Sequence, residues 1–261
     1  MKKVRHHFQL FDTSEDRDVR DAFLSKWREE LKGQRAFVIG NGPSLSPGDL
    51  DLIQGEVSLA SNLIHLIYPQ TSWRPTFVSI TDPLVWQKFW HRKPAIVSPL
   101  LADTRFSRPP CPVDIIRFPQ VPIFSNERLA LRHKGKPFTS DLSRGYFGGF
   151  TVTYFNLQLA IWLGLNPIYL LGVDHKYGEG EASAWLPRQR SAENKISHFH
   201  SEYRREGEVV KTAPLQGMER FYRTASQVAK NLEIEIVNLT PNSMLRAFKR
   251  GELKKVLENR A

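Results

Sequence analysis

FVIGNGPSL, residues 37–45, runs from an apolar strand into a turn of glycine, asparagine, proline and serine. An uninterrupted apolar strand is typical of a parallel sheet that is buried on both faces. At the end of such a strand, a glycine-rich turn can bring backbone N–H groups and small side chains close to a phosphate. The stretch therefore predicts an α/β fold with a nucleotide-type ligand at Gly40, Asn41, Gly42 and Ser44. A tight strand-to-helix turn without a ligand is the alternative interpretation of the same glycines.

The composition is that of a globular protein. The chain has 261 residues, of which 41% are hydrophobic and 25% charged, and no apolar stretch approaches the ~20 residues that span a bilayer. No apolar segment follows the basic start at residues 1–7, which argues against a signal peptide. The one cysteine, Cys111, excludes an internal disulfide and a cysteine zinc site. We expect a cytoplasmic protein.

The net charge of +10 favours anionic partners such as nucleotides, acidic glycans or lipid headgroups. No helix-turn-helix, RNA-recognition or zinc-finger pattern is present, so nucleic acid is not an expected partner. Residues 243–258 are predicted to form a basic amphipathic helix, which could rest peripherally on the inner face of an anionic membrane. A solvated helix, and a charge that serves solubility alone, are the alternatives.

Apolar patterns alternate between strand and helix along most of the chain. Strands are expected at residues 36–39, 57–62, 76–82, 95–98, 114–118, 167–174 and 235–239, and helices within 1–34 and at 151–163, 215–232 and 243–258. The pattern predicts a helical extension at 1–34 and a single Rossmann-like domain at 35–261, with a mostly parallel sheet flanked by helices. Two proline-rich or polar segments, about 99–147 and 178–213, are expected to form irregular lids.

Small polar residues follow several of the expected strands. Asn41, Asn62 and Asp82 end three successive strands, and Asp174 ends a later one. Since ligands bind at the carboxyl ends of the strands of an open parallel sheet, we expect Asn41, Asn62 and Asp82 to converge on one crevice.

Five motifs in fixed order give a more specific resemblance. They are residues 40–45 (GNGPSL), 148–154 (GGFTVTY), 168–175 (IYLLGVDH), 197–200 (SHFH) and 240–243 (TPNS). The chain resembles the bacterial DUF115 domain, which is also labelled as similar to an archaeal pterin diphosphokinase. It is similar as well to the sialyltransferases of glycosyltransferase family 42, which use CMP-activated sialic acid. The resemblance extends from about residue 36 to about residue 250.

The resemblance to the sialyltransferases implies a metal-independent transferase that needs no cofactor beyond its nucleotide-sugar donor. In that family, asparagines at the positions of Asn41 and Asn62 contact the nucleotide sugar, whereas Asp82 replaces a third asparagine. A carboxylate there would repel an anionic donor unless it is paired or protonated. The family's threonine-serine-glycine at the nucleotide corresponds to residues 151–153, where Thr151 keeps its hydroxyl in place and Thr153 is also a candidate.

The catalytic candidates follow from the same comparison. The family's tyrosine that steadies the leaving phosphate corresponds to Lys176, with Tyr177 one residue later. Histidine suits the general base because its ordinary pKa is ~6.5. The family's base falls at His198 or His200, and only one would face the crevice if the segment is extended. The serine after His200 favours that residue.

Asn242 and Ser243 would border the nucleotide, with a helix cap as the alternative role. A cap or a backbone contact is also the favoured role of Asp174.

Three functions stay open. The first is a sialyltransferase-like enzyme that moves a sugar from a nucleotide donor, CMP-linked in the related enzymes, to a cell-surface glycan precursor. The second is a 6-hydroxymethylpterin diphosphokinase-like enzyme that uses ATP, with Mg²⁺ held by Asp82 and Asp174. The third is a non-catalytic module that binds a nucleotide or glycan. A homo-oligomer is open in each case.

Overall fold

The structure is a computed structural model. It describes residues 12–92, 94–95, 97–106, 115–121, 132–176, 198–211 and 214–258, and the backbone of 189–191.

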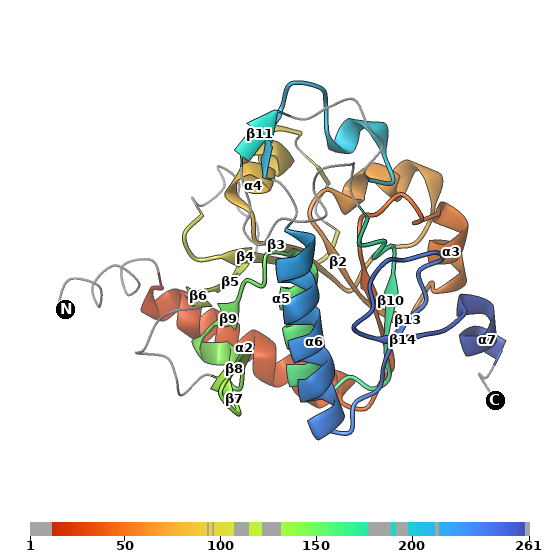
Figure 1. The fold of residues 1–261 in the computed structure, drawn as a ribbon. Helices are drawn as coiled ribbons and strands as arrows, with labels where there is room; N and C mark the ends of the chain where they lie inside the picture. Colours follow the sequence, from red (N-terminus) through yellow and green to blue (C-terminus); the bar gives the residue numbers. More distant parts are fainter. Residues whose placement is uncertain are drawn as a thin grey trace.

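The centre of the fold is a sheet of eight parallel strands (Figure 1) in the order β14-β13-β10-β1-β2-β3-β4-β5. The strands are β1 (Ala36–Ile39), β2 (Val57–Ser61), β3 (Phe77–Ile80), β4 (Leu100–Asp103), β5 (Ile115–Phe118), β10 (Ile168–Leu171), β13 (Ile236–Asn238) and β14 (Lys249–Arg250). From β1 the chain moves outward through β2 to β5, and it returns on the other side through β10, β13 and β14. The strand order therefore reverses between β1 and β10, where open α/β sheets bind their ligands.

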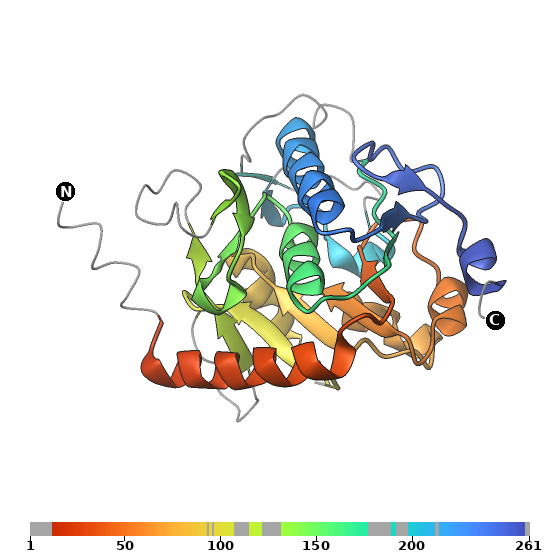
Figure 2. The same cartoon turned by 90° about the horizontal axis from the view of Figure 1, so that it is seen from below.

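Helices cover both faces of the sheet (Figure 2), as a parallel sheet requires. One face carries α2 (Ser14–Leu31), α5 (Val152–Trp162) and α6 (Leu215–Asn231). The other carries α3 (Pro47–Leu52), the 3₁₀ helix η1 (Ile64–Gln70), α4 (Pro83–His91) and α7 (Leu253–Glu258). Alternate residues of β1 enter the two cores: Ala36 and Val38 pack on the first side, and Phe37 and Ile39 on the second. These features confirm the predicted Rossmann-like fold.

Short elements surround the sheet. A parallel pair joins β6 (Gln120–Val121) and β9 (Tyr146–Phe147), and antiparallel pairs join β7 (Arg132–His133) to β8 (Lys136–Thr139) and β11 (Gln189–Ser191) to β12 (Val209–Lys211). Two 3₁₀ turns, η3 (Leu142–Arg144) and η4 (Ser201–Tyr203), complete them. The described residues contain no helix whose length and apolar character would let it cross a bilayer.

Three expectations about these regions are wrong. Residues 99–147 are not simply an irregular lid, because β4 and β5 lie within them and belong to the central sheet. The described residues 95, 97 and 98 form no strand: proline occupies positions 94 and 99, Val97 is half exposed, and the strand begins at Leu100. Residues 243–258 are not one helix, since β14 pairs with β13 and α7 begins only at Leu253. Of the second expected lid, the described parts are β11, η4 and β12.

Candidate functional site

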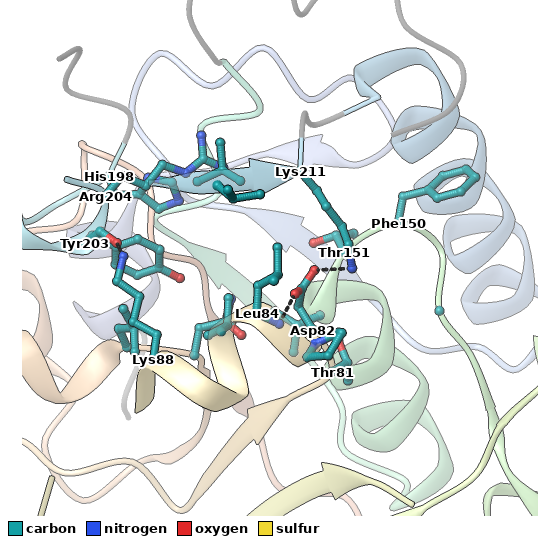
Figure 3. A pocket seen from close by; sticks show the side chains of 18 of the residues that line it. Thr81, Asp82, Leu84, Lys88, Phe150, Thr151, His198, Tyr203, Arg204 and Lys211 are labelled. Carbon is teal, nitrogen blue, oxygen red and sulfur yellow. Dashed lines mark hydrogen bonds and ion pairs between the residues drawn. The ribbon is translucent and has the colours of Figure 1, made fainter. Parts of the chain in front are cut away.

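A cleft with two connected parts lies at the carboxyl ends of the strands. The inner compartment has a volume of about 80 Å³ and lies at the ends of β1 and β10. The outer compartment, of about 540 Å³, lies beyond the ends of β2, β3 and β4 (Figure 3). The residues that line both are Asn62, Thr151, Val152, His198, Tyr203 and Met218. The predicted convergence of strand ends therefore produces a real cleft.

The glycine turn after β1 is packed tightly against the end of β10. The N–H of Gly40 donates to the carbonyl of Leu171 at 2.7 Å, and the N–H of Gly42 donates to that of Gly172 at 2.8 Å. A methyl group on Gly40 would lie 2.3 Å from the carbonyl oxygen of Gly172. The expectation that the turn brings its N–H groups to a phosphate is not met by these two groups, because Leu171 at the end of β10 and Gly172 just after it already accept from them. The steric interpretation accounts for both glycines.

Ser44 and Asp174 fasten the same turn from the side. The Ser44 hydroxyl donates to the Asp174 carboxylate at 2.7 Å, and the Asp174 carbonyl accepts from the N–H of Met244 at 2.8 Å. Burial raises the pKa of the Asp174 carboxyl, and the hydrogen bond from Ser44 opposes that shift. Asp174 lines the inner compartment, but its contacts are those of a residue that ties three segments together.

Asn41 and Asn62 line the cleft, and each carries a buried acceptor without a hydrogen-bond partner in the described part of the chain. The Asn41 amide donates to the Ser61 hydroxyl at 2.9 Å and to the Ser61 carbonyl at 3.3 Å. Its Oδ1 is buried, as is the Oδ1 of Asn62, and neither has a hydrogen-bond partner within the described part of the chain. Both residues line the inner compartment. A buried amide oxygen without a partner is costly, so a ligand that donates hydrogen bonds would be favoured here.

The N-terminus of α5 borders both compartments. Thr151 caps the helix by accepting from the N–H of Thr153 at 3.3 Å, and both residues line the inner compartment. Gly149 and Phe150 have φ of 57° and 64°, and this left-handed turn leads the chain into the helix. The first turn of a helix carries partial positive charge, which favours an anion at this place.

Asp82 lies on the wall of the outer compartment with its charge balanced. It accepts from the N–H of Leu84 at 2.8 Å, which caps α4, and it pairs with the Lys211 ammonium at 2.9 Å (Figure 3). The carboxylate that the sequence places at this strand end is therefore paired. The described residues contain no group of three or more His, Cys, Asp or Glu side chains that could hold a metal. Asp82 and Asp174, the two carboxylates that would hold Mg²⁺ in the diphosphokinase alternative, line different compartments.

Of the two candidate bases, His198 lines the cleft. Its ring stacks on Tyr203 with centroids 3.9 Å apart. Burial, together with the charges of Arg204 and Lys88, holds the pKa of His198 well below its usual value, so the imidazole is neutral. His200 lines neither compartment, and its Nδ1 accepts from the N–H of Glu202 at 3.1 Å. The preference for His200 fails because a 3₁₀ turn follows it and uses its ring as a cap.

The other candidates have mixed outcomes. Lys176 lines the inner compartment, whereas Tyr177 lies outside the described residues. Asn242 and Ser243 line neither compartment. The Ser243 hydroxyl donates to the carbonyl of Val173 at 2.6 Å, so it supports the loop after β10. Neither residue caps a helix, since none begins there.

Several residues of the outer compartment were not expected from the sequence. They are Lys88, Arg105, Tyr203, Arg204, Glu208 and Lys211. Lys88 pairs with Glu208 and donates to the carbonyl of Tyr203, so contacts far apart in sequence bring these groups together. No local motif marks such contacts.

Comparison with known proteins gives one likeness. No family model matches the chain, and no curated protein matches it. A solved structure, that of the MAf glycosyltransferase from Magnetospirillum magneticum AMB-1, superposes with a TM-score of 0.52 at 14% sequence identity. The match covers 91% of this chain and 38% of that one, so this chain spans well under half the length of its structural neighbour. At this identity the likeness shows the fold, which a glycosyltransferase also uses.

Proposed function

We propose that the protein is a glycosyltransferase that moves a sugar from a CMP-linked donor to a cell-surface glycan precursor. The observation that carries the proposal is the pair of unsatisfied Oδ1 atoms on Asn41 and Asn62. Ribose hydroxyls and the amino group of a base are the donors such atoms accept from. The N-terminus of α5, which borders the same space, suits the donor phosphate. The fold shared with a glycosyltransferase supports the reaction class.

The chemistry requires a base, a charged leaving group and an acceptor hydroxyl. His198, being neutral, takes the proton from the acceptor hydroxyl as its oxygen attacks the anomeric carbon. The bond from that carbon to the donor phosphate breaks, and the phosphate leaves with the electron pair. Lys176, on the wall of the inner compartment, and the first turn of α5 would stabilise the charge that develops there. We predict that Tyr177 is a second group that contacts the leaving phosphate.

Nucleotide binding is the first test. Thermal unfolding is measured with CMP, UDP, GDP and ATP, each with and without Mg²⁺. At ~100-fold the dissociation constant, a ligand adds about 2.7 kcal/mol, or about 5–10 °C for a chain of this length. We expect stabilisation by CMP without metal, lost in Asn62→Ala and kept in Asn231→Ala, an exposed position at the end of α6.

Three outcomes would count against the proposal. Stabilisation by ATP with Mg²⁺ alone would support the diphosphokinase. Equal CMP stabilisation in Asn62→Ala would remove the observation on which the proposal rests. If His198→Gln keeps both CMP binding and full transfer activity, the base is misassigned.

A further inference from the structure

The outer compartment carries more positive than negative charge. The cationic side chains on its wall are Lys88, Arg105, Arg204 and Lys211. Both acidic side chains on that wall are already engaged, since Glu208 pairs with Lys88 and Asp82 with Lys211. Of the two arginines, Arg105 pairs with Asp103 beneath the wall, and Arg204 has no ion pair among the described residues.

Arg105 is held in place by a carboxylate beneath it. Asp103 is fully buried, and its two oxygens accept from Nε at 2.8 Å and from Nη2 at 2.7 Å of the Arg105 guanidinium. The Tyr146 hydroxyl donates to the same carboxylate at 2.8 Å. A buried carboxylate is tolerated only when it is paired and hydrogen-bonded, so this unit fixes one edge of the guanidinium.

The turn that carries Arg105 is also fixed. Arg117 donates to the carbonyls of Thr104 and Phe106, on either side of Arg105. Nη2 of Arg105 donates in addition to the side-chain oxygen of Gln120. Within the described part of the chain Nη1 has no hydrogen-bond partner, and the side chain is 44% exposed. A rigid guanidinium with unused donors suits an anion, because little motion is lost on binding.

Arg204 supplies the second cation. It is half buried on the wall of the same compartment, and no ion pair holds it among the described residues. Its neighbour in sequence, Arg205, is exposed and pairs with Glu202 at 3.1 Å. The two adjacent arginines therefore differ in their environment, which provides a matched control.

We propose that Arg105 and Arg204 form an anion subsite in the outer compartment, which binds a carboxylate or phosphate carried by the sugar or by its acceptor. The identity of the molecule that bears the anion rests on the proposed function, whereas the subsite itself rests on the two arginines. Arginine binds both groups because its planar donors match their oxygens.

The test compares three simple probes at constant ionic strength: glucuronate, glucose 6-phosphate and glucose. Their dissociation constants are measured by calorimetry or by ligand-observed magnetic resonance. We expect at least one charged probe to bind about tenfold more tightly than glucose, as a charge-assisted hydrogen bond allows. Preference for glucuronate assigns the subsite to a carboxylate, and preference for glucose 6-phosphate assigns it to a phosphate. Equal binding of all three probes to the wild-type protein overturns the proposal.

The variants show whether the two arginines are responsible. Arg204→Gln and Asp103→Asn/Arg105→Gln should each lose most of the preference, and Arg205→Gln should keep it. The double replacement avoids an unpaired buried carboxylate, and Arg204→Gln disturbs no ion pair among the described residues. A preference that survives in both variants overturns the proposal.

CMP titration of the same variants separates this inference from the proposed function. If CMP fails to bind the wild-type protein while the anion preference is present, the subsite stands and the proposed donor is wrong. If CMP binds and the preference is absent, the subsite alone fails. Loss of CMP affinity in the arginine variants would assign the arginines to the donor phosphate and overturn the inference.

Discussion

Replacing Gly40 by alanine tests whether the turn after β1 is glycine-rich for packing or for a ligand. The added methyl would lie 2.3 Å from the carbonyl oxygen of Gly172 and 2.9 Å from a methyl carbon of Val173. The backbone carbonyl cannot rotate out of the way as a flexible side chain could. Strands β1 and β10 would have to separate at the point where Gly40 donates to Leu171 at 2.7 Å.

The size of the effect follows from this geometry. Forcing one extra carbon into a well-packed core costs about 1–3 kcal/mol. A contact this short with backbone atoms belongs at the upper end of that range. For a chain of about this length each kcal/mol lowers Tm by about 2–4 °C, so the expected decrease is about 5–10 °C.

Gly48→Ala is the matched control. Gly48 lies in α3, and the nearest atom to its added methyl would be the Ser46 hydroxyl oxygen, 3.9 Å away. Alanine there should be neutral or stabilise by about 0.4–1 kcal/mol. Both variants and the wild-type protein are unfolded by heat in the absence of ligand. Equal midpoints for Gly40→Ala and the wild-type protein would refute the packing argument and restore the ligand interpretation of the turn.

Three further predictions concern titration and burial. Magnetic resonance should show that the pKa of His198 lies well below its usual value of ~6.5. In Arg204→Gln this pKa should rise, because the Arg204 guanidinium is one of the charges that, together with burial, lower it. Burial lowers the pKa of His65 to about 4, so the unfolded chain takes up a proton near pH 6.5 while the folded protein does not. The free energy of unfolding should therefore decrease from pH 7 to pH 4. Urea midpoints should show a smaller decrease in His65→Leu. Arg20 is 1% exposed and pairs with Asp12 at 2.8 Å. Arg20→Met should therefore lower the free energy of unfolding, measured with urea, by about 3–5 kcal/mol. Arg17 is exposed, and Arg17→Met should change that free energy by no more than about 0.5 kcal/mol.

Each of these has a clear contrary result. A His198 midpoint at its usual value would show a solvated ring. Identical pH profiles of stability in His65→Leu and the wild-type protein would show that His65 is not the group responsible. A mild effect of Arg20→Met would mean that water replaces the lost hydrogen bonds.

The fold could be predicted where the signal is local. The apolar run of β1 and the helical spacing of residues 152–162 specify their own structure, and both formed as expected. The expected strand is absent at the described residues 95, 97 and 98, which lie between two prolines, and the expected helix at 243–258 is interrupted by a strand that pairs with β13. Such effects depend on partners distant in the sequence.

The site residues also divide into those that local sequence could predict and those that depend on distant contacts. The parallel-sheet rule correctly brought Asn41 and Asn62 to one cleft. It could not reveal that Leu171, at the end of β10, and Gly172, just after it, would accept from the N–H groups of the glycine turn, since both lie far along the chain from that turn. Nor could residue spacing decide between His198 and His200, because a 3₁₀ turn, rather than an extended segment, follows them. The buried carboxylate under Arg105 likewise depends on Tyr146, from the distant strand β9.

The hydrogen bonds around the loop after β10 have a consequence for attempts to shorten the protein. Val173 and Asp174 bond to Thr240, Ser243 and Met244, so the floor of the inner compartment is built jointly by the middle and the last part of the chain. A fragment that stopped before Thr240 would keep the glycine turn and both asparagines, yet it would lack the brace that sets their spacing. Any minimal version of this protein must therefore retain residues 240–244, even though no proposed catalytic group lies on them.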